Sequence, residues 1–135
     1  MGDLSFNLSR WEMACRCRCG FDTVDVDLVK NIQEICNHFA DKYEGRAALI
    51  VTGPNRCDAH NAETPGAAPG SLHTQAKAMD FKLKVDGKHI PPREVYDHIN
   101  EAYPNQYGLG LYSNRVHFDV RSGAAERWPR DLDEL

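Results

Sequence analysis

In two segments of this chain, apolar residues recur at the spacing of one face of a helix. Five apolar residues at spacings of three and four predict an amphipathic helix from about residue 26 to 43. Asp25 suits the N-cap of this helix, and Gly45 suits its end. A second, shorter stripe predicts a helix from about Pro92 to Ala102, with proline at a favourable first position.

Two segments alternate strictly between apolar and other residues, which predicts strands with one core-facing side. In segment 78–85 the apolar side chains occupy alternate positions, so Asp80 lies on the opposite face. In segment 115–121 the same alternation places His117 and Asp119 away from the core. One face of the sheet is therefore expected to be polar and to carry these side chains.

The remaining segments complete the outline. The apolar run 47–52 predicts a buried strand, and segment 55–70, rich in glycine, proline and small residues, predicts a long loop of the kind that often carries function. Segment 107–112 predicts another strand. Gly108 and Gly110 fall on one face of it, leaving room for a ligand or for close backbone approach.

Composition narrows the classes of function. The 135 residues fit one domain, 1–135, with a cysteine-containing entry segment at 1–25 and a C-terminal tail at 122–135. A net charge of −4 argues against nucleic acid as a partner. The chain lacks an apolar run of roughly 20 residues, so we expect no membrane insertion, and its first residues do not resemble a signal peptide. We expect a soluble monomer made in the cytoplasm.

The five cysteines leave two alternatives open. Cys15, Cys17 and Cys19 are too close in sequence for ordinary disulfides with one another. They could bind a second zinc ion with Cys36 or Cys57 as the fourth ligand, although thiolate zinc sites usually have wider ligand spacing. The alternative, which we favour from the sequence, is an extended segment whose cysteines pack on one face as small apolar groups.

Two histidines and one aspartate stand out as candidate metal ligands. His73 and Asp80 come from SLHTQAKAMDF, and His117 comes from RVHFDVR. Two neutral imidazoles and one carboxylate are the ligand set of a catalytic zinc site, which keeps one position open for water. These residues favour a hydrolase.

The same segments resemble a known family. TGPNRCDAHN, SLHTQAKAMDF and GLGLYSNRVHFDVR are similar to the zinc D-alanyl-D-alanine carboxypeptidase-like peptidases, in particular a short bacterial and phage branch that cleaves peptidoglycan peptides. The resemblance extends from WEMACRCRCGF to Arg121. It implies an α+β fold with an antiparallel sheet flanked by helices, shared with hedgehog signalling domains. It also implies that His73, Asp80 and His117 bind one catalytic Zn²⁺ ion.

The resemblance suggests roles for neighbouring residues. Arg56 matches an arginine that stabilises the oxyanion or holds a substrate carboxylate. Ser71 matches a serine that could bind substrate through a hydrogen bond. Tyr112, with Gly108 and Gly110, matches the pattern that shapes the wall of the cleft.

This chain differs from many relatives of the family at the position of the general base. They carry an acid three residues before the last histidine, where this chain has Asn114. Asp119 is the remaining carboxylate on the same strand face, so we expect it to act as general base or as a partner that orients a ligand histidine. His60 and Glu63 are reserve candidates.

The activity implied by the resemblance is zinc-dependent hydrolysis of peptide bonds by activated water. The expected substrates are stem or cross-link peptides of peptidoglycan, cut at D-Ala-D-Ala, L-Ala-D-Glu or cross-bridge bonds, as by a wall-remodelling peptidase or an endolysin. An endolysin would act at the cell wall, and a phage enzyme could leave the cytoplasm through a holin-type pore. The alternative is a zinc-bearing binding or structural module on the same fold that does not catalyse hydrolysis.

Overall fold

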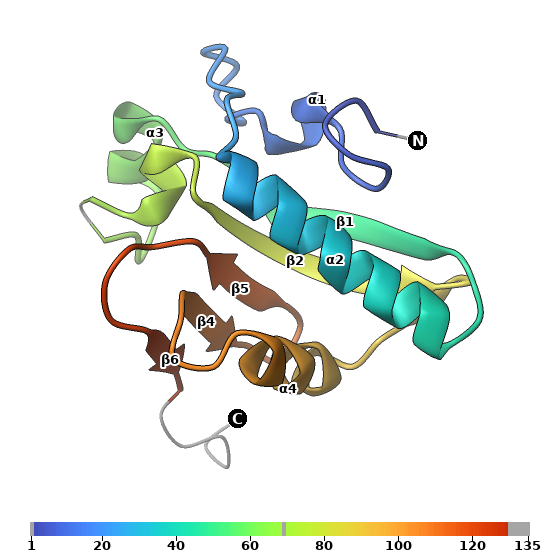
Figure 1. Cartoon of the computed structure of the whole chain (residues 1–135). Coiled ribbons are helices and arrows are strands. Elements are labelled where there is room, and N and C mark those ends of the chain that lie inside the picture. Colours follow the sequence, from blue (N-terminus) through green and yellow to red (C-terminus); the bar gives the residue numbers. More distant parts are fainter. Residues whose placement is uncertain (1, 69, 130–135) are drawn as a thin grey trace.

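The computed structural model describes residues 2–68 and 70–129, which combine helices with one sheet (Figure 1). The helices are α1 (Arg10–Met13), α2 (Val26–Lys42), α3 (Asp58–Glu63) and α4 (Pro92–Ala102), and the short 3₁₀-helix η1 spans Leu72–Gln75. The strands are β1 (Ala47–Gly53), β2 (Ala78–Val85), β3 (Lys88–His89), β4 (Gly108–Leu111), β5 (Val116–Asp119) and β6 (Glu126–Trp128).

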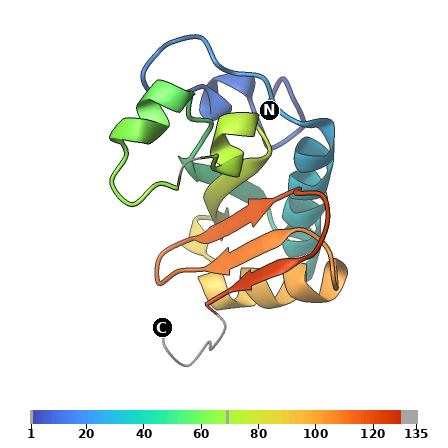
Figure 2. The ribbon, with the colours of Figure 1, turned by 90° about the vertical axis from the view of Figure 1, so that its left-hand side faces the viewer.

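The sheet is mixed rather than wholly antiparallel, and the expected antiparallel sheet was wrong in this respect. Its strand order is β1-β2-β5-β4-β6, with β3 paired to β2. All neighbours run antiparallel except β4 and β6, which run parallel. After β5 the chain reverses and passes beyond β4 to the outer edge (Figure 2). Because β4 and β6 both run opposite to β5, they run parallel to each other.

A single core lies between the helices and the apolar face of the sheet. The apolar sides of α2 and α4 pack with the inward residues of β2, β4 and β5. Phe39, Phe81 and Phe118 are among its largest fully buried side chains. Burying each stabilises the fold by roughly 1.5–3 kcal/mol. The core therefore fixes which side chains of these strands point the other way.

Most of the predicted elements are confirmed. Helix α4 has the predicted bounds, and α2 ends one residue earlier than expected. The carboxylate of Asp25 caps α2 by accepting a hydrogen bond of 2.8 Å from the amide of Asp27. Within the described residues, no helix is long and apolar enough to cross a bilayer.

Two segments differ from their predictions. The expected loop 55–70 contains α3, which the sequence did not indicate because its six residues carry no apolar stripe. The cysteine segment 15–19 was predicted to be extended and packed, which was wrong. Arg18 has a positive φ of 65°, its amide bonds to the carbonyl of Cys15, and Cys17 and Cys19 are exposed.

Candidate metal site and cavity

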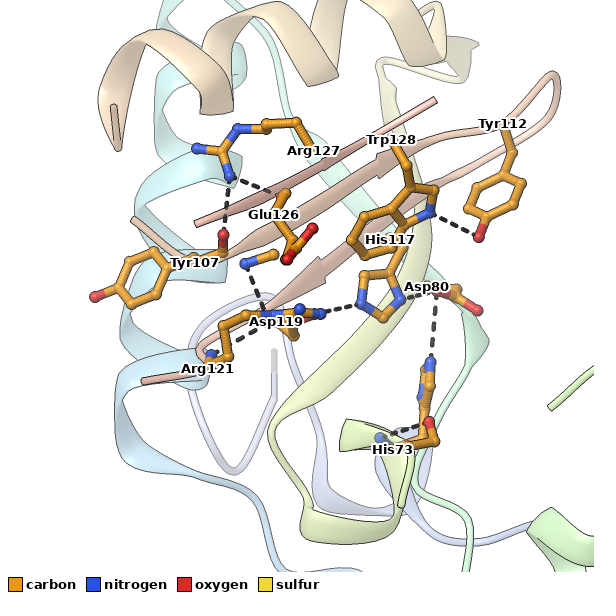
Figure 3. Close-up of polar contacts among 12 residues, drawn as sticks. His73, Asp80, Tyr107, Tyr112, His117, Asp119, Arg121, Glu126, Arg127 and Trp128 are labelled. Carbon is orange, nitrogen blue, oxygen red and sulfur yellow. Dashed lines mark hydrogen bonds and ion pairs between the residues drawn. The ribbon is translucent and has the colours of Figure 1, made fainter. Parts of the chain in front are cut away.

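The three candidate ligands come together on the polar face of the sheet (Figure 3). Asp80 of β2 and His117 of β5 are direct partners in the strand register, so their side chains leave the sheet side by side. His73 reaches them from η1. One ligand atom from each of the three residues lies within 4.8 Å of the others. Core packing on the opposite face thus determines where these atoms meet.

His73 is held in a single tautomer by the backbone. Its Nδ1 lies 2.9 Å from the carbonyl oxygen of Pro54, and the side chain is buried. A carbonyl oxygen only accepts hydrogen bonds, so Nδ1 carries the proton. In the neutral ring, Nε2 then carries the lone pair, and this atom lies 3.6 Å from Oδ1 of Asp80.

His117 lies between two carboxylates. Its Nε2 is 2.7 Å from Oδ2 of Asp119, and its Nδ1 is 2.8 Å from Oδ1 of Asp80. Burial lowers the pKa of His117, but the hydrogen bonds to Asp119 and Asp80 outweigh it and raise the pKa above its usual value. A neutral ring protonated on Nε2 would turn its Nδ1 lone pair toward a carboxylate oxygen. That contact requires a cation between the two atoms, either a proton or a metal ion.

Asp80 remains ionised in this setting. Burial opposes its ionisation, but the hydrogen bond with His117 and the nearby ring of His73 outweigh burial and lower its pKa well below the usual range. Two ring nitrogens and an ionised carboxylate oxygen then face one point. This donor set fits Zn²⁺ in chemistry and in number, with one position left open.

Asp119 is enclosed by hydrogen bonds. Its side chain is 0% exposed and accepts from Nε2 of His117, from the amides of Gly108 and Arg121, and from Nε and Nη2 of Arg121. Burial raises the pKa of Asp119, but the bonds from Arg121 and His117 outweigh it and hold the pKa well below its usual range. The carboxylate is thus fixed and charged, which suits it to orient His117.

Three glycines make space for the site. A Cβ atom on Gly53 would collide with the side chain of Asp80, and one on Gly108 would collide with the carboxylate of Asp119. A Cβ atom on Gly110 would collide with the indole of Trp128. The room that we expected for a ligand beside Gly108 and Gly110 is therefore taken by two side chains of the chain itself.

The metal site opens into a cavity of about 550 Å³, within the usual range for ligand sites. Arg56, Ser71 and Tyr112 line it together with the three candidate ligands. Among the described residues, Asp80 and Asp119 are the carboxylates that line it, and neither Asn114 nor the reserve candidates His60 and Glu63 do so. The other lining residues are Thr64, Pro65, Gly66, Ala67, Ala68, Gly70, Leu72, Arg115, Arg121 and Trp128.

Arg56 is held at the cavity wall by two side chains. Its Nε donates to Oδ1 of Asn61 at 3.0 Å, and its Nη2 donates to Oγ of Ser71 at 3.3 Å. Ser71 also caps η1 by accepting from the amide of His73 at 3.2 Å. The hydroxyl of Ser71 therefore links the arginine to the helix that carries a candidate ligand.

Sequence reasoning missed Trp128 and Asn61. Trp128 stacks obliquely on His117, with ring centroids 4.9 Å apart, and its Nε1 donates to the hydroxyl of Tyr112 at 3.0 Å. It belongs to the segment predicted to be a tail. Asn61 also donates to the carbonyl of Ala68 at 2.9 Å, which fixes the loop at the cavity rim. Trp128 acts through a partner 16 residues away, and Asn61 acts through residues of an irregular loop whose sequence shows no periodic pattern.

Comparison with known proteins agrees with this geometry. A family model described as peptidase M15 matches residues 6–119, which include all three candidate ligands. The searches of curated proteins and of solved structures gave no match. The chain therefore belongs to the peptidase M15 family of zinc D-Ala-D-Ala carboxypeptidase-like metallopeptidases.

Proposed function

We propose that this chain hydrolyses peptide bonds of bacterial peptidoglycan, with one zinc ion held by His73, Asp80 and His117. The observation that carries the proposal is the convergence of one donor atom from each residue at the cavity. The candidate bonds are D-Ala-D-Ala, as for a carboxypeptidase, and L-Ala-D-Glu or cross-bridge bonds, as for an endolysin-like endopeptidase. One chain supplies every group named in this proposal, so we propose that it acts as a monomer.

Zinc, when bound, supplies a Lewis acid that polarises the scissile carbonyl and lowers the pKa of water. The residues of the chain prepare its ligands. Pro54 holds the proton of His73 on Nδ1, and Asp119 holds that of His117 on Nε2. In its neutral form, each imidazole thus turns an unprotonated nitrogen toward Asp80, as a ligand set requires.

Of the two roles expected for Asp119, we propose the orienting one. Its two carboxylate oxygens already accept bonds from His117, Gly108 and Arg121, and its side chain has no exposed surface. A general base needs access to the proton that it takes and a pKa near the working pH. Asp119 has neither property, whereas an enclosed carboxylate that receives the N–H of a ligand histidine matches a positioning residue.

Arg56 is proposed to stabilise developing negative charge or to hold a substrate carboxylate. A guanidinium group has five N–H donors, and Asn61 and Ser71 use one each. The remaining donors are available to a bound peptide at the cavity. Because Asn61 and Ser71 fix the plane of the group, little further ordering is needed when substrate binds.

Ser71 and Tyr112 are proposed to contact the substrate. Both line the cavity and are only half buried. Arg115 lies over the ring of Tyr112, 4.1 Å from its centroid. Together with Arg56 it gives the wall a positive character that suits stem peptides, whose D-Glu and terminal carboxylates are negative.

The test is digestion of purified peptidoglycan with the zinc-loaded protein, followed by mass spectrometry of the fragments. We expect peptide fragments whose masses identify the cleaved bond. His73→Ala should give none, and His89→Ala, which removes an exposed histidine outside the cavity, should match the unaltered protein. A wild-type protein with full zinc content and no fragments would contradict the proposal.

That last outcome would favour the second candidate, a zinc-bearing binding module without hydrolytic activity. The observation behind it is the lack of a free carboxylate among the described residues at the cavity, with Asn114 at the position where many relatives carry an acid. Zinc-dependent retention of peptidoglycan without fragments would identify such a module.

A further inference from the structure

A second group of candidate ligands lies outside the cavity. The sulfurs of Cys15, Cys17, Cys19 and Cys57 all lie within 4.8 Å of one another. The Sγ atom of Cys17 is 3.3 Å from that of Cys15 and 3.5 Å from that of Cys57. None of these residues belongs to the set His73, Asp80 and His117, so the cluster requires its own explanation.

The backbone is folded to bring these alternate cysteines together. The amide of Arg18 bonds to the carbonyl of Cys15 at 3.0 Å, and the positive φ of Arg18 curls the chain between the cysteines. The amide of Cys15 bonds to the carbonyl of Phe21 at 2.9 Å, which closes the loop. A one-residue spacing in a strand would spread the sulfurs along one face, whereas this turn gathers them around a point.

The surroundings of the cluster suit negative sulfur. The amide of Cys57 donates to Sγ of Cys15, and the amide of His60 donates to Sγ of Cys57, both at 3.4 Å. Bonds from backbone N–H groups favour the thiolate form. Arg16 and Arg18 alternate with the cysteines in the sequence, so the segment itself carries two positive charges.

We propose that Cys15, Cys17, Cys19 and Cys57 bind a structural zinc ion, separate from the ion in the cavity. Four thiolates at about 2.3 Å from a tetrahedral zinc ion lie roughly 3.8 Å from one another. The sulfur of Cys17 lies 3.3 Å from that of Cys15 and 3.5 Å from that of Cys57, and all four sulfurs lie within 4.8 Å of one another. A four-cysteine set fills every position of the ion, so this site would bind no water and would act in stability rather than in catalysis.

The main competing explanation is a pair of disulfides. A disulfide requires two sulfurs at about 2.05 Å and cysteine Cα atoms with room for the bridge, which a single intervening residue does not readily give. Three of the four cysteines are separated by one residue each. Two disulfides among the four would therefore have to include a pair from this segment, with one residue between the cysteines or, for Cys15 and Cys19, three. One metal ion can hold all four without such a pair.

The cluster would connect the entry segment to the part of the chain that supports the cavity. Cys57 is the N-cap of α3 and directly follows Arg56. In the same stretch, the amide of Asn55 bonds to the carbonyl of Met13 at 3.1 Å, and Pro54 holds the ring of His73. The proposed ion would thus hold residues 54–57 in place from the side of the entry segment.

The test is metal analysis of the purified, reduced chain, with Co²⁺ substitution as a spectroscopic probe. We expect two zinc ions per chain, and in the cobalt form a strong thiolate-to-cobalt charge-transfer absorption. Cys19→Ser and Cys57→Ser should each lose this absorption and one zinc ion. His73→Ala should lose the other ion and keep the absorption, so failure of the cavity site and failure of the cysteine site are distinguishable.

Cys36→Ala is the matched control, since Cys36 is buried in α2 and lies outside the cluster. It should keep both ions. The wild-type spectrum needs no variant, and Cys19 is exposed, so its replacement does not disturb the core. A single zinc ion per wild-type chain without the charge-transfer absorption would overturn the proposal. Recovery of the four cysteines as disulfides, after alkylation of protein purified with zinc and without a reductant, would do the same.

Discussion

Asp119 is the residue whose replacement best separates the two roles considered for it. If it orients His117, Asp119→Asn should weaken zinc binding by about 10–100-fold, with turnover largely recovered at saturating zinc. If it were the general base, zinc affinity would hold and turnover would fall by about 10²–10⁴-fold at any zinc concentration. Zinc titration combined with turnover of a stem peptide measures both quantities.

Asp97→Asn serves as the control for this change. Asp97 is exposed in α4, and its ion pair with Arg93 is 4.0 Å long. It should leave zinc affinity and turnover unchanged. Unaltered zinc affinity in Asp119→Asn would contradict the orienting role.

Gly108 and Gly110 form a natural pair for a second test. Gly108→Ala would push against the carboxylate of Asp119, so we expect a stability loss of about 1–3 kcal/mol and weaker zinc binding. Gly110→Ala would push against the indole of Trp128 instead, which should raise KM more than it changes zinc affinity. Denaturant unfolding and zinc titration of both variants would check this, and identical behaviour of the two would argue against it.

At the scale of elements, β6 is the part of the sheet that completes the cavity wall. Trp128 packs on His117 and donates to Tyr112. Trp128→Ala should therefore raise KM for a peptide substrate while zinc content stays the same. Trp128→Phe keeps an aromatic ring and loses the N–H donor. Its KM, measured by steady-state kinetics, should therefore lie between those of the unaltered protein and of Trp128→Ala. A fall in kcat with KM unchanged would speak against a role in substrate binding.

The sequence predicts elements where the periodic pattern is long. Helix α4 and strand β2 have their predicted bounds, and the alternation in β2 and β5 gives the faces of Asp80 and His117. It does not predict α3 or β6, because six and three residues are too few for a period to appear. The curled cysteine segment has a strand-like pattern, and Cys57, the partner that its sulfurs meet, lies 40 residues from Cys17.

The candidate site was likewise predictable only where the sequence carries a local pattern. Its three candidate ligands lie in recognisable motifs, so the sequence singles out His73, Asp80 and His117, which the structure brings together. The contacts that fix them do not show in any local pattern. The Pro54 carbonyl lies 19 residues from His73, and Trp128 reaches Tyr112 across 16 residues. Such contacts depend on strand order, which the sequence does not specify directly.

For the whole molecule, pH should act oppositely on the metal-free and the zinc-loaded protein. The raised pKa of His117 means that its stabilising contribution is complete below about pH 6.5 and is lost as pH rises through the raised value. The lowered pKa values of Asp80 and Asp119 give stability that is present above about pH 3.9 and is lost as pH falls below it. The chelator-treated protein should therefore have its highest Tm at mildly acidic pH.

In the zinc-loaded protein, stability should rise rather than fall as pH increases from mildly acidic to neutral. Binding must displace the proton held between His117 and Asp80, so affinity should rise with pH through the range in which His117 titrates. Calorimetric titration of Cys19→Ser, which lacks the proposed cysteine site, in buffers of different ionisation enthalpy would show the proton release. A zinc affinity independent of pH between mildly acidic and neutral solution would contradict this account. His89→Ala, which leaves the site intact, should reproduce the wild-type profile.

The strand that brings Trp128 to the cavity lies beyond residue 119, where the match to the family model ends. The strands that carry Asp80 and His117 thus lie within the matched residues, while one wall of the cavity comes from a short edge strand, which among the described residues pairs with β4 alone. Such a strand can be exchanged during evolution, or by an engineer, without disturbing the register of Asp80 and His117. Divergence in substrate preference among relatives should therefore concentrate at this edge, and grafting it between them offers a route to altered specificity.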